Sequence, residues 1–341
     1  MIVNKAQLQR ALEIVKPGLA SKEQIEQSTS FAFIQGRVIT YNDEISISHP
    51  VKGLELEGAI LAENLYKFLT KIKKEEIELE LRDNEIVLTS EKAKAGLLLQ
   101  AEIKLPLDEE VSEKGEWKLL PEHFLTDLAF VMTICGKDMS RPILTACHIN
   151  KAGFIEGSDG YRISRCELGE AMPVNTFLLP AKSAIEVVKM NPTKIAEGKG
   201  WIHFRTKAGT VIHCRILVKD RYPTTTGWFD NEGTKVRLPK NTNEILARAQ
   251  VFAKRDHLLD ESIILSFEKG LFKMTSHSDT GWFEEEAEME YKGSPVKIDV
   301  TPYLLKSILE ETGTFKYTED KLTFKGERWF YVTTLRHPKK A

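Results

Sequence analysis

The chain has 341 residues, 42% apolar and 29% charged, and its 48 Lys and Arg against 50 Asp and Glu give a formal net charge of -2 at pH 7. The composition excludes a disordered or collagen-like chain, the length predicts two or three domains, and near-neutral charge excludes a uniformly basic nucleic-acid binder, although charges sorted by face remain allowed. Because no apolar run approaches the length of a membrane-spanning helix and residues 1–10 lack a signal-peptide pattern, we expect a cytoplasmic protein with no membrane association.

Amphipathic helices are predicted at a regular interval along the chain. The first lies at the N-terminus, where Leu8, Leu12 and Val15 share one face. Later helical patterns begin 59, 59, 59 and 63 residues apart, at Ala62, Pro121, Pro180, Pro239 and Pro302. Proline suits a first helical turn because its missing N–H would have no intrahelical partner there.

Glycine-containing turns repeat at twice that interval. Gly36, Gly153 and Gly270 are 117 residues apart, and each lies between two strand-like runs. Residues 77–81 alternate apolar and acidic side chains, which predicts a strand with one buried face. A unit of strand, helix and strands is therefore used six times, two units to a domain. We predict an α+β chain of three tandem domains with boundaries at 1–114, 115–233 and 234–341.

The motifs of common enzymes are missing from the sequence. Its four cysteines form no CxxC pair, its histidines form no HExxH, and there is no nucleotide-binding fingerprint. Residues 157–160, Gly-Ser-Asp-Gly, lack the lysine and spacing of a phosphate loop and are typical of a turn. We therefore predict buried thiols, no catalytic residues, no metal and no cofactor.

Cations gather on and beside the predicted helices, whereas acidic side chains dominate strand-like runs such as residues 75–80 and 284–288. Lys189 and Lys194 are assigned to the helix that follows Pro180. If the helices line one surface, that surface is positive and binds a polyanion through its phosphates without reading sequence. The alternative is a mixture of charges that only solvates exposed faces. The candidate cations are Lys71, Lys73, Lys137, Arg141, Lys189, Lys194 and Arg248.

Four short motifs occur in the order found in one known family. Residues 157–164, GSDGYRIS, resemble A-T-D-G-H-R-L-A of the bacterial DNA sliding clamp, the beta subunit of DNA polymerase III. Residues 220–223 (DRYP) are similar to its D-G-R-F-P, residues 282–288 (WFEEEAE) to its E-Q-E-E-A-E-E, and residues 329–336 (WFYVTTLR) to its Y-V-V-M-P-M-R-L. The resemblance covers the whole chain and identifies a divergent or phage-encoded member of this family.

The resemblance implies a head-to-tail homodimeric ring in which helices line the hole and antiparallel sheets form the outside. Such a ring is a processivity factor: it encircles double-stranded DNA without sequence preference and tethers the DNA polymerase. The family's DNA-contacting loop falls on residues 136–141, with Lys137 and Arg141 as candidates. Its neighbouring aromatic pair is replaced here by Pro142 and Ile143.

The resemblance also implies a cleft into which the polymerase and the clamp loader insert short peptide motifs. Tyr161 stands where the family has His, and its terminal Met-Pro-Met falls on residues 334–336. Alternatively, Asp159 and Gly160 only form a hairpin turn and Ile163 only belongs to a core. The expected cleft residues are Leu144, Ser158, Gly160, Tyr161, Arg162, Ile163, Pro223, Val332 and Thr334.

A seam between the two subunits is implied as well. The family joins the last strand of its first domain, here residues 91–99, to the third domain of the other subunit. Phe252 is alternatively only a core residue of its helix, because it lies at a core position of the helical pattern. The expected seam residues are Lys92, Lys94, Leu97, Leu99, Val251, Phe252, Glu284, Glu286 and Glu288.

Two other classes of protein compete with this interpretation. A ring-forming structural protein that does not tether DNA would need no basic lumen. A nuclease would use Asp159 with further carboxylates and a metal ion, but the internal repeat puts Asn42 and Ser276 opposite Asp159.

Overall fold

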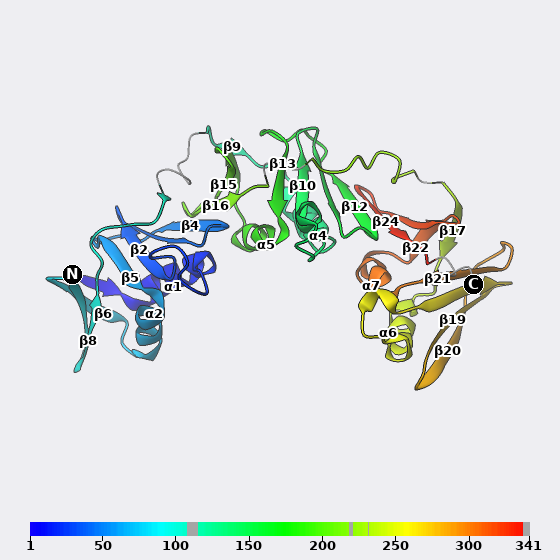
Figure 1. Ribbon diagram of the computed structural model, residues 1–341, viewed down its shortest axis with the longest axis horizontal. Helices are drawn as coiled ribbons and strands as arrows, with labels where there is room; N and C mark the ends of the chain where they lie inside the picture. The colour runs from blue at the N-terminus through cyan, green and yellow to red at the C-terminus, as the bar shows by residue number, and fades with distance from the viewer. Residues whose placement is uncertain (108–114, 218–220, 231, 337–341) are drawn as a thin grey trace. The chain divides into compact units, whose positions relative to one another are not determined.

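The structure is a computed structural model that describes residues 1–107, 115–217, 221–230 and 232–336 (Figure 1). Two compact units make up the chain: Met1–Met132 with Ala146–Gly153 and Glu170–Asp220, and Thr133–Thr145 with Phe154–Gly169 and Arg221–Ala341. Residues 114 and 231, at or beside the predicted domain boundaries, and Asp220 of the DRYP motif lie outside the described residues. Helices and antiparallel sheets confirm the predicted α+β class.

The first unit contains two antiparallel sheets and a further strand pair. One sheet has the strand order β5 (Gly58–Leu61), β2 (Ser30–Ile34), β3 (Arg37–Tyr41), β4 (Ile45–Pro50), β16 (Val211–Arg215), β15 (Trp201–Arg205), β14 (Lys194–Glu197) and β9 (Lys118–Leu119). The other has the order β1 (Ile2–Asn4), β6 (Glu76–Arg82), β7 (Glu85–Ser90) and β8 (Ala93–Leu98). The strand pair is β10 (Ala146–Asn150) with β13 (Phe177–Pro180).

Helices of the first unit lie side by side in two pairs (Figure 1). They are α1 (Lys5–Val15) with α2 (Ala62–Lys71), and α4 (Phe124–Met132) with α5 (Ala181–Met190). A 3-10 turn, η1 (Lys16–Gly18), follows α1. The Asn4 side chain accepts a hydrogen bond from the Gln7 N–H at 2.9 Å, which caps the start of α1. Leu8, Leu12 and Val15 are buried, as the periodicity predicts.

The structure corrects the prediction for Lys194. Helix α5 ends at Met190, because Asn191 takes a left-handed conformation with φ 52° and Pro192 cannot continue the helical hydrogen-bond pattern. Lys194 is therefore the first residue of strand β14 and not a residue of the helix.

The second unit also contains two antiparallel arrays of strands. One has the order β11 (Phe154–Ser158), β12 (Arg162–Glu167), β24 (Trp329–Thr334), β23 (Lys321–Lys325), β22 (Thr314–Tyr317) and β17 (Thr234–Arg237). The other has the order β20 (Gly281–Glu288), β19 (Leu271–Ser278), β18 (Ile263–Glu268) and β21 (Val296–Val300). Helix α6 (Thr242–Ala253) packs on α7 (Pro302–Glu311), and short turns form η2 (Pro142–Thr145) and η3 (Leu258–Asp260).

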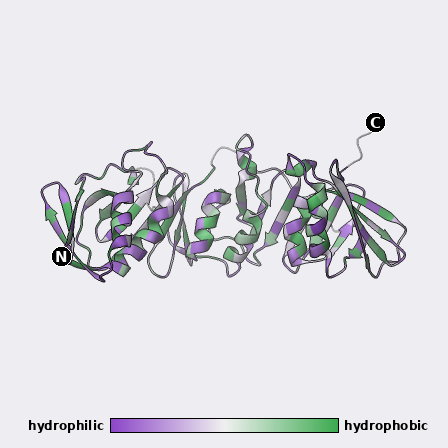
Figure 2. Ribbon diagram, turned by 90° about the horizontal axis from the view of Figure 1, so that it is seen from below, coloured by the Kyte–Doolittle hydropathy of each residue, from purple (hydrophilic) through white to green (hydrophobic). Residues whose placement is uncertain are grey.

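The helices are amphipathic, and Figure 2 shows hydrophilic and hydrophobic stripes along them. In α6, Ile245, Leu246 and Ala249 are buried, and in α7 the buried residues include Leu305 and Ile308. No helix in the described ranges is long and apolar enough to cross a membrane.

The repeated glycines lie in hairpin turns, as predicted. Gly36 and Gly270 each follow a residue that also has a positive φ, which is the geometry of a tight two-residue turn. Gly153 has φ 95°, and a Cβ there would lie 2.1 Å from the Glu170 carbonyl oxygen, so no larger residue fits. The four cysteines are buried thiols that form no disulfide, which confirms that prediction too.

A buried histidine pair lies inside the first unit. His203 on β15 and His213 on β16 are direct cross-strand partners, with their Nδ1 atoms 2.8 Å apart. Among the described residues, Nε2 of His203 has no hydrogen-bond partner. Burial lowers the pKa of His203 from 6.5 to about 4, and burial also lowers the pKa of His213 well below its usual value. Both imidazoles are therefore neutral at pH 7.

We expect the free energy of unfolding to fall as the pH drops from 6.5 towards 4. The unfolded chain binds protons at these histidines below pH 6.5, whereas folded His203 binds its proton only near pH 4, so acid favours the unfolded state. His203 alone accounts for about 3 kcal/mol over this range. Urea unfolding at a series of pH values measures the slope. His203→Gln should flatten it, and an equal slope in that variant would contradict the assignment.

Candidate functional site

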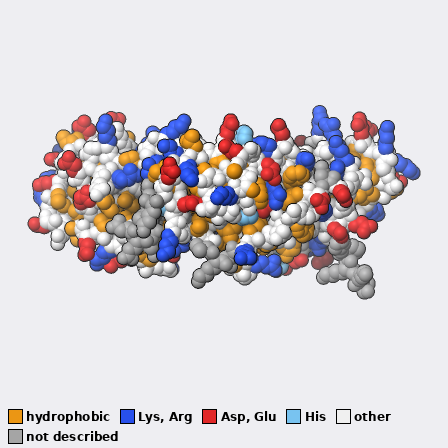
Figure 3. Space-filling view, turned by 90° about the horizontal axis from the view of Figure 1, so that it is seen from above, with side chains coloured by type: hydrophobic (Ala, Val, Ile, Leu, Met, Phe, Trp, Pro, Cys, Tyr) orange, Lys and Arg blue, Asp and Glu red, His pale blue; other side chains and the backbone are white. Residues whose placement is uncertain are grey.

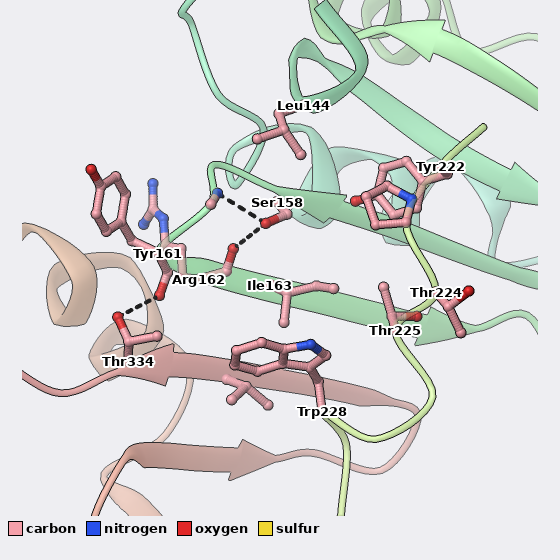
Figure 4. A pocket seen from close by; sticks show the side chains of 13 residues that line it. Leu144, Ser158, Tyr161, Arg162, Ile163, Tyr222, Thr224, Thr225, Trp228 and Thr334 are labelled. Atoms are coloured by element: carbon pink, nitrogen blue, oxygen red, sulfur yellow. Dashed lines mark hydrogen bonds between the residues drawn. The ribbon is translucent and has the colours of Figure 1, made fainter. Parts of the chain in front are cut away.

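A cavity of about 250 Å³ lies in the second unit, where β11, β12 and β24 meet residues 221–228 (Figure 4). All nine residues expected from the resemblance line it: Leu144, Ser158, Gly160, Tyr161, Arg162, Ile163, Pro223, Val332 and Thr334. It is also lined by four residues that the sequence reasoning missed: Tyr222, Thr224, Thr225 and Trp228.

The floor of the cavity is apolar. Ile163 on β12 is the direct cross-strand partner of Val332 on β24, so both side chains point to the same face. They are 7% and 1% exposed. Leu144, from the turn η2, adds a third apolar side chain across from them (Figure 4). The floor can therefore take apolar side chains of a ligand but offers them no polar partner.

The mouth of the cavity is built from backbone groups and hydroxyls. Thr334 donates two hydrogen bonds to the Tyr161 carbonyl, from its N–H at 3.0 Å and from its hydroxyl at 3.1 Å. Ser158 donates its hydroxyl proton to the Arg162 carbonyl at 2.8 Å and accepts the Gly160 N–H at 3.0 Å. Tyr161 is 43% exposed, which leaves a phenol at the mouth for a ligand.

Asp159 and Gly160 form a tight turn between β11 and β12. Gly160 has φ 91°, and one Asp159 carboxylate oxygen accepts the N–H groups of Tyr161 and Arg162 at 3.0 Å each. The turn interpretation is therefore correct, and the same turn forms one end of the cavity. Whether the cavity is a partner cleft stays a prediction.

Arg162 is held by its own neighbours. Its Nε donates to Asp159 at 2.8 Å, its Nη2 donates to the Tyr303 hydroxyl at 2.7 Å, and its guanidinium lies 4.4 Å from the centre of the Tyr303 ring. Both Asp159 carboxylate oxygens thus accept hydrogen bonds from neighbouring residues. The described residues also contain no cluster of three or more His, Cys, Asp and Glu that could hold a metal ion.

Trp228 separates this cavity from a second, open one of about 530 Å³. The backbone N–H of Trp228 donates to the Thr225 carbonyl at 3.0 Å, and the backbone carbonyl of Trp228 accepts from Lys321 Nζ at 3.0 Å. The residue is 45% exposed. The one signal for it in the sequence is a tryptophan in an irregular Thr- and Gly-containing segment, directly after the DRYP motif.

The candidate cations of the first unit are exposed but are placed differently from one another. Lys71 ends helix α2 and Lys73 follows it, whereas Lys189 lies in the last turn of α5, 2.8 Å from Glu186. Lys194 lies on a strand, as described above. Figure 3 shows acidic and basic side chains interspersed on the face that it presents.

In the second unit, Lys137 and Arg141 are exposed in the loop before η2. Arg141 also lies beside the cavity, because a Cβ built on Gly160 would be 3.4 Å from its Nη1. Arg248 on α6 donates two hydrogen bonds to Glu285, at 2.8 and 2.7 Å. A phosphate at Arg248 would therefore compete with that carboxylate for the guanidinium charge.

The strands expected at the seam are both edge strands of their sheets, β8 in the first unit and β20 in the second. Lys94 is exposed on β8, Lys92 is exposed in the preceding turn, and Leu97 is half-buried. Leu99 is only 5% exposed: β8 ends at Leu98, and the Leu99 N–H donates to the Asn84 carbonyl at 2.8 Å. The exposed leucine is Leu98, at 69%.

On β20, Glu284, Glu286 and Glu288 are exposed, and Lys273 contacts the first two at 3.0 and 2.8 Å. Trp282 at the start of the same strand is 74% exposed. Beside them on α6, Val251 is 68% exposed. Phe252 is only partly buried and stacks on Phe283 with ring centres 6.4 Å apart.

No family model matches the sequence, and no curated protein is similar to it. Solved structures match it along 99% of both chains: the DNA polymerase III beta subunits of Pseudomonas aeruginosa (15% identity, TM-score 0.84), Streptococcus pneumoniae TIGR4 (18%, 0.84) and Thermotoga maritima (18%, 0.82). The fold of the chain is that of a DNA sliding clamp. In particular, it is the fold of the beta subunit of DNA polymerase III, as the motifs predict.

Proposed function

We propose that this chain is a DNA sliding clamp that encircles double-stranded DNA as a head-to-tail homodimer and tethers a DNA polymerase. One observation carries the proposal: a chain with the full-length sliding-clamp fold also has a cavity lined by all nine residues expected for a partner cleft. The proposal includes three clamp domains, at residues 1–114, 115–233 and 234–341. It assigns the protein no catalytic activity, no metal and no cofactor, and a place in the cytoplasm.

Contacts with DNA are assigned to exposed cations on and near the helices. A closed ring holds DNA topologically, so each contact can be weak, mobile and independent of sequence. Lys137 and Arg141 are the strongest candidates, because both are exposed and share one loop. Arg248 is the weakest, because Glu285 already neutralises it.

Partners are assigned to the cavity between Ile163, Val332 and Trp228. Its apolar floor and its rim of hydroxyls and backbone groups suit an extended peptide with one or two apolar side chains. The polymerase and the clamp loader are the proposed carriers of such peptides.

Retention on circular DNA tests the function. We expect dimers reassembled from monomers in the presence of a plasmid to elute with the circle during gel filtration and to be released when the plasmid is linearised. On linear duplex, binding should be weak and should fall steeply as salt rises. Equal retention on circular and linear DNA would argue against encirclement.

The variant Lys137→Glu with Arg141→Glu sharpens this test. Losing two phosphate contacts should reduce the slope of log affinity against log salt by about 2, equally for all DNA sequences. Lys269→Glu with Lys292→Glu is a charge-matched control, since both lysines are exposed in connections between strands, at β18–β19 and β20–β21, and are not candidate DNA contacts. A ring-forming structural protein without a tethering role would show no difference between the two variants.

A further inference from the structure

A buried ion pair lies beside the cavity, on the same face of β11 and β12 as Ser158 and Ile163. Glu156 on β11 and Arg165 on β12 are direct cross-strand partners, and Arg165 Nε donates to Glu156 Oε1 at 2.7 Å. The Glu156 side chain is 2% exposed and that of Arg165 is 20% exposed. A carboxylate this deeply buried needs several hydrogen bonds to offset its lost hydration.

Thr225 supplies one of those bonds from a different part of the chain. Its hydroxyl donates to Glu156 Oε1 at 2.6 Å and accepts from Arg165 Nη2 at 3.1 Å, and the residue is 7% exposed. Thr225 belongs to residues 221–229, which we call the wall segment. The wall segment is neither helix nor strand, so no ladder of backbone hydrogen bonds holds it in place.

Phe229 forms a second attachment on the other side of Trp228. The Arg165 guanidinium lies 4.3 Å from the centre of the Phe154 ring and 4.6 Å from that of Phe229. Phe229 also packs on Phe330, the cross-strand partner of Arg165, with ring centres 6.0 Å apart. Arginine suits this position because its planar head can donate hydrogen bonds in its plane while aromatic rings contact its faces.

Trp228 therefore lies between two attachments that share Arg165. Trp228 itself is 45% exposed. In Figure 4 the indole is drawn next to Ile163, whose side chain forms the floor, and both residues line the cavity, so the position of the indole sets the width of the cavity.

We propose that Glu156, Arg165 and Thr225 are positioning residues that hold Trp228 as the fixed wall of the cavity and so determine which peptides bind. The ligand class is an extended peptide with an apolar side chain that fits between the indole and the pair Ile163 and Val332. The peptide part rests on the proposed function, whereas the positioning of Trp228 does not. A preformed wall raises affinity because binding no longer has to order the wall segment.

The test compares Thr225→Val, which removes the hydroxyl at nearly constant shape, with Thr225→Ser, which keeps it. The full-length protein is labelled with fluorotryptophan, and Trp228→Phe assigns the Trp228 signal among the five tryptophans. In Thr225→Val the Trp228 fluorine signal should shift or broaden while the other four stay in place. Thr225→Ser should give the wild-type spectrum.

Peptide binding is the second measurement. The probe is fluorescein-labelled Gly-Ser-Leu-Ser-Phe-Gly, whose two apolar side chains share one face of an extended chain, and the same peptide with Ser at both positions is its control. Thr225→Val should bind the probe about tenfold more weakly than wild type, and Thr225→Ser should bind it like wild type.

An unchanged Trp228 signal in Thr225→Val would overturn the proposal. A shifted signal with unchanged probe affinity would overturn its second half, that the position of Trp228 determines binding. If wild-type protein does not bind the probe, the assignment of peptides to this cavity fails, and the fluorine spectra still decide whether the network positions Trp228.

Discussion

Replacement of Ile163 by Asp is expected to abolish binding of a partner peptide while leaving the fold and the oligomeric state unchanged. In the free protein the new carboxylate lies on the floor of an open cavity and keeps some water. A bound peptide would seal it against Leu144 and Val332, which offer no hydrogen bond. An unpaired buried charge costs about 3–5 kcal/mol, which weakens binding by more than about a hundredfold.

Fluorescence anisotropy of a labelled peptide and stimulation of a DNA polymerase measure the effect. Ile163→Val keeps the floor apolar and should cost only a few-fold in affinity. Ile185→Asp is the matched control, because Ile185 is an isoleucine on α5 that is 38% exposed. Full-strength binding by Ile163→Asp would place the partner site elsewhere.

The second large effect is expected at the seam between two copies of the chain. Edge strands β8 and β20 can pair in antiparallel register so that Lys94 lies opposite Glu286 and Leu98 opposite Trp282. In both pairs the side chains are exposed on their own chains. The same register puts the half-buried Leu97 opposite Phe283 on the other face, beside Phe252. Lys92, in the turn before β8, then comes close to Glu288.

Lys92→Glu combined with Lys94→Glu should shift the dimer towards monomer. Each exposed ion pair is worth only about 0–1 kcal/mol, so Lys92→Glu alone should do little. In the proposed ring, the double change turns attraction into repulsion at both seams, and the apolar pairs alone must then hold the dimer together. Sedimentation at low micromolar concentration and low salt measures the monomer fraction.

Reversing Glu286 and Glu288 to Lys in the same chain should bring back the dimer. We expect the recovery to be incomplete, because Lys273 lies 2.8 Å from Glu286 and would repel a lysine there. Glu288→Lys together with Lys92→Glu avoids that neighbour and is the cleaner exchange. If the variant Lys92→Glu with Lys94→Glu stays fully dimeric, this seam is removed from consideration.

The sequence by itself determined the features that depend on short-range rules. Buried Leu8, Leu12 and Val15 follow from helical periodicity, and the turns at Gly36 and Gly270 follow from the conformations that glycine alone adopts easily. Eight of the nine cavity residues lie in motifs whose order resembles a known family, Leu144 was carried over from the same resemblance, and all nine line one cavity here. Their use in binding stays a prediction.

The tertiary structure alone decided which residues meet from distant parts of the chain and where each element ends. Lys194 falls on a strand because Asn191 ends the helix three residues earlier, and Leu98 rather than Leu99 is exposed because the chain turns inward after β8. Glu156 and Thr225 are 69 residues apart in sequence and carry no motif. Their hydrogen bond, and with it the placement of Trp228, exists only because folding brings a sheet and an irregular segment together, and no local pattern encodes that encounter.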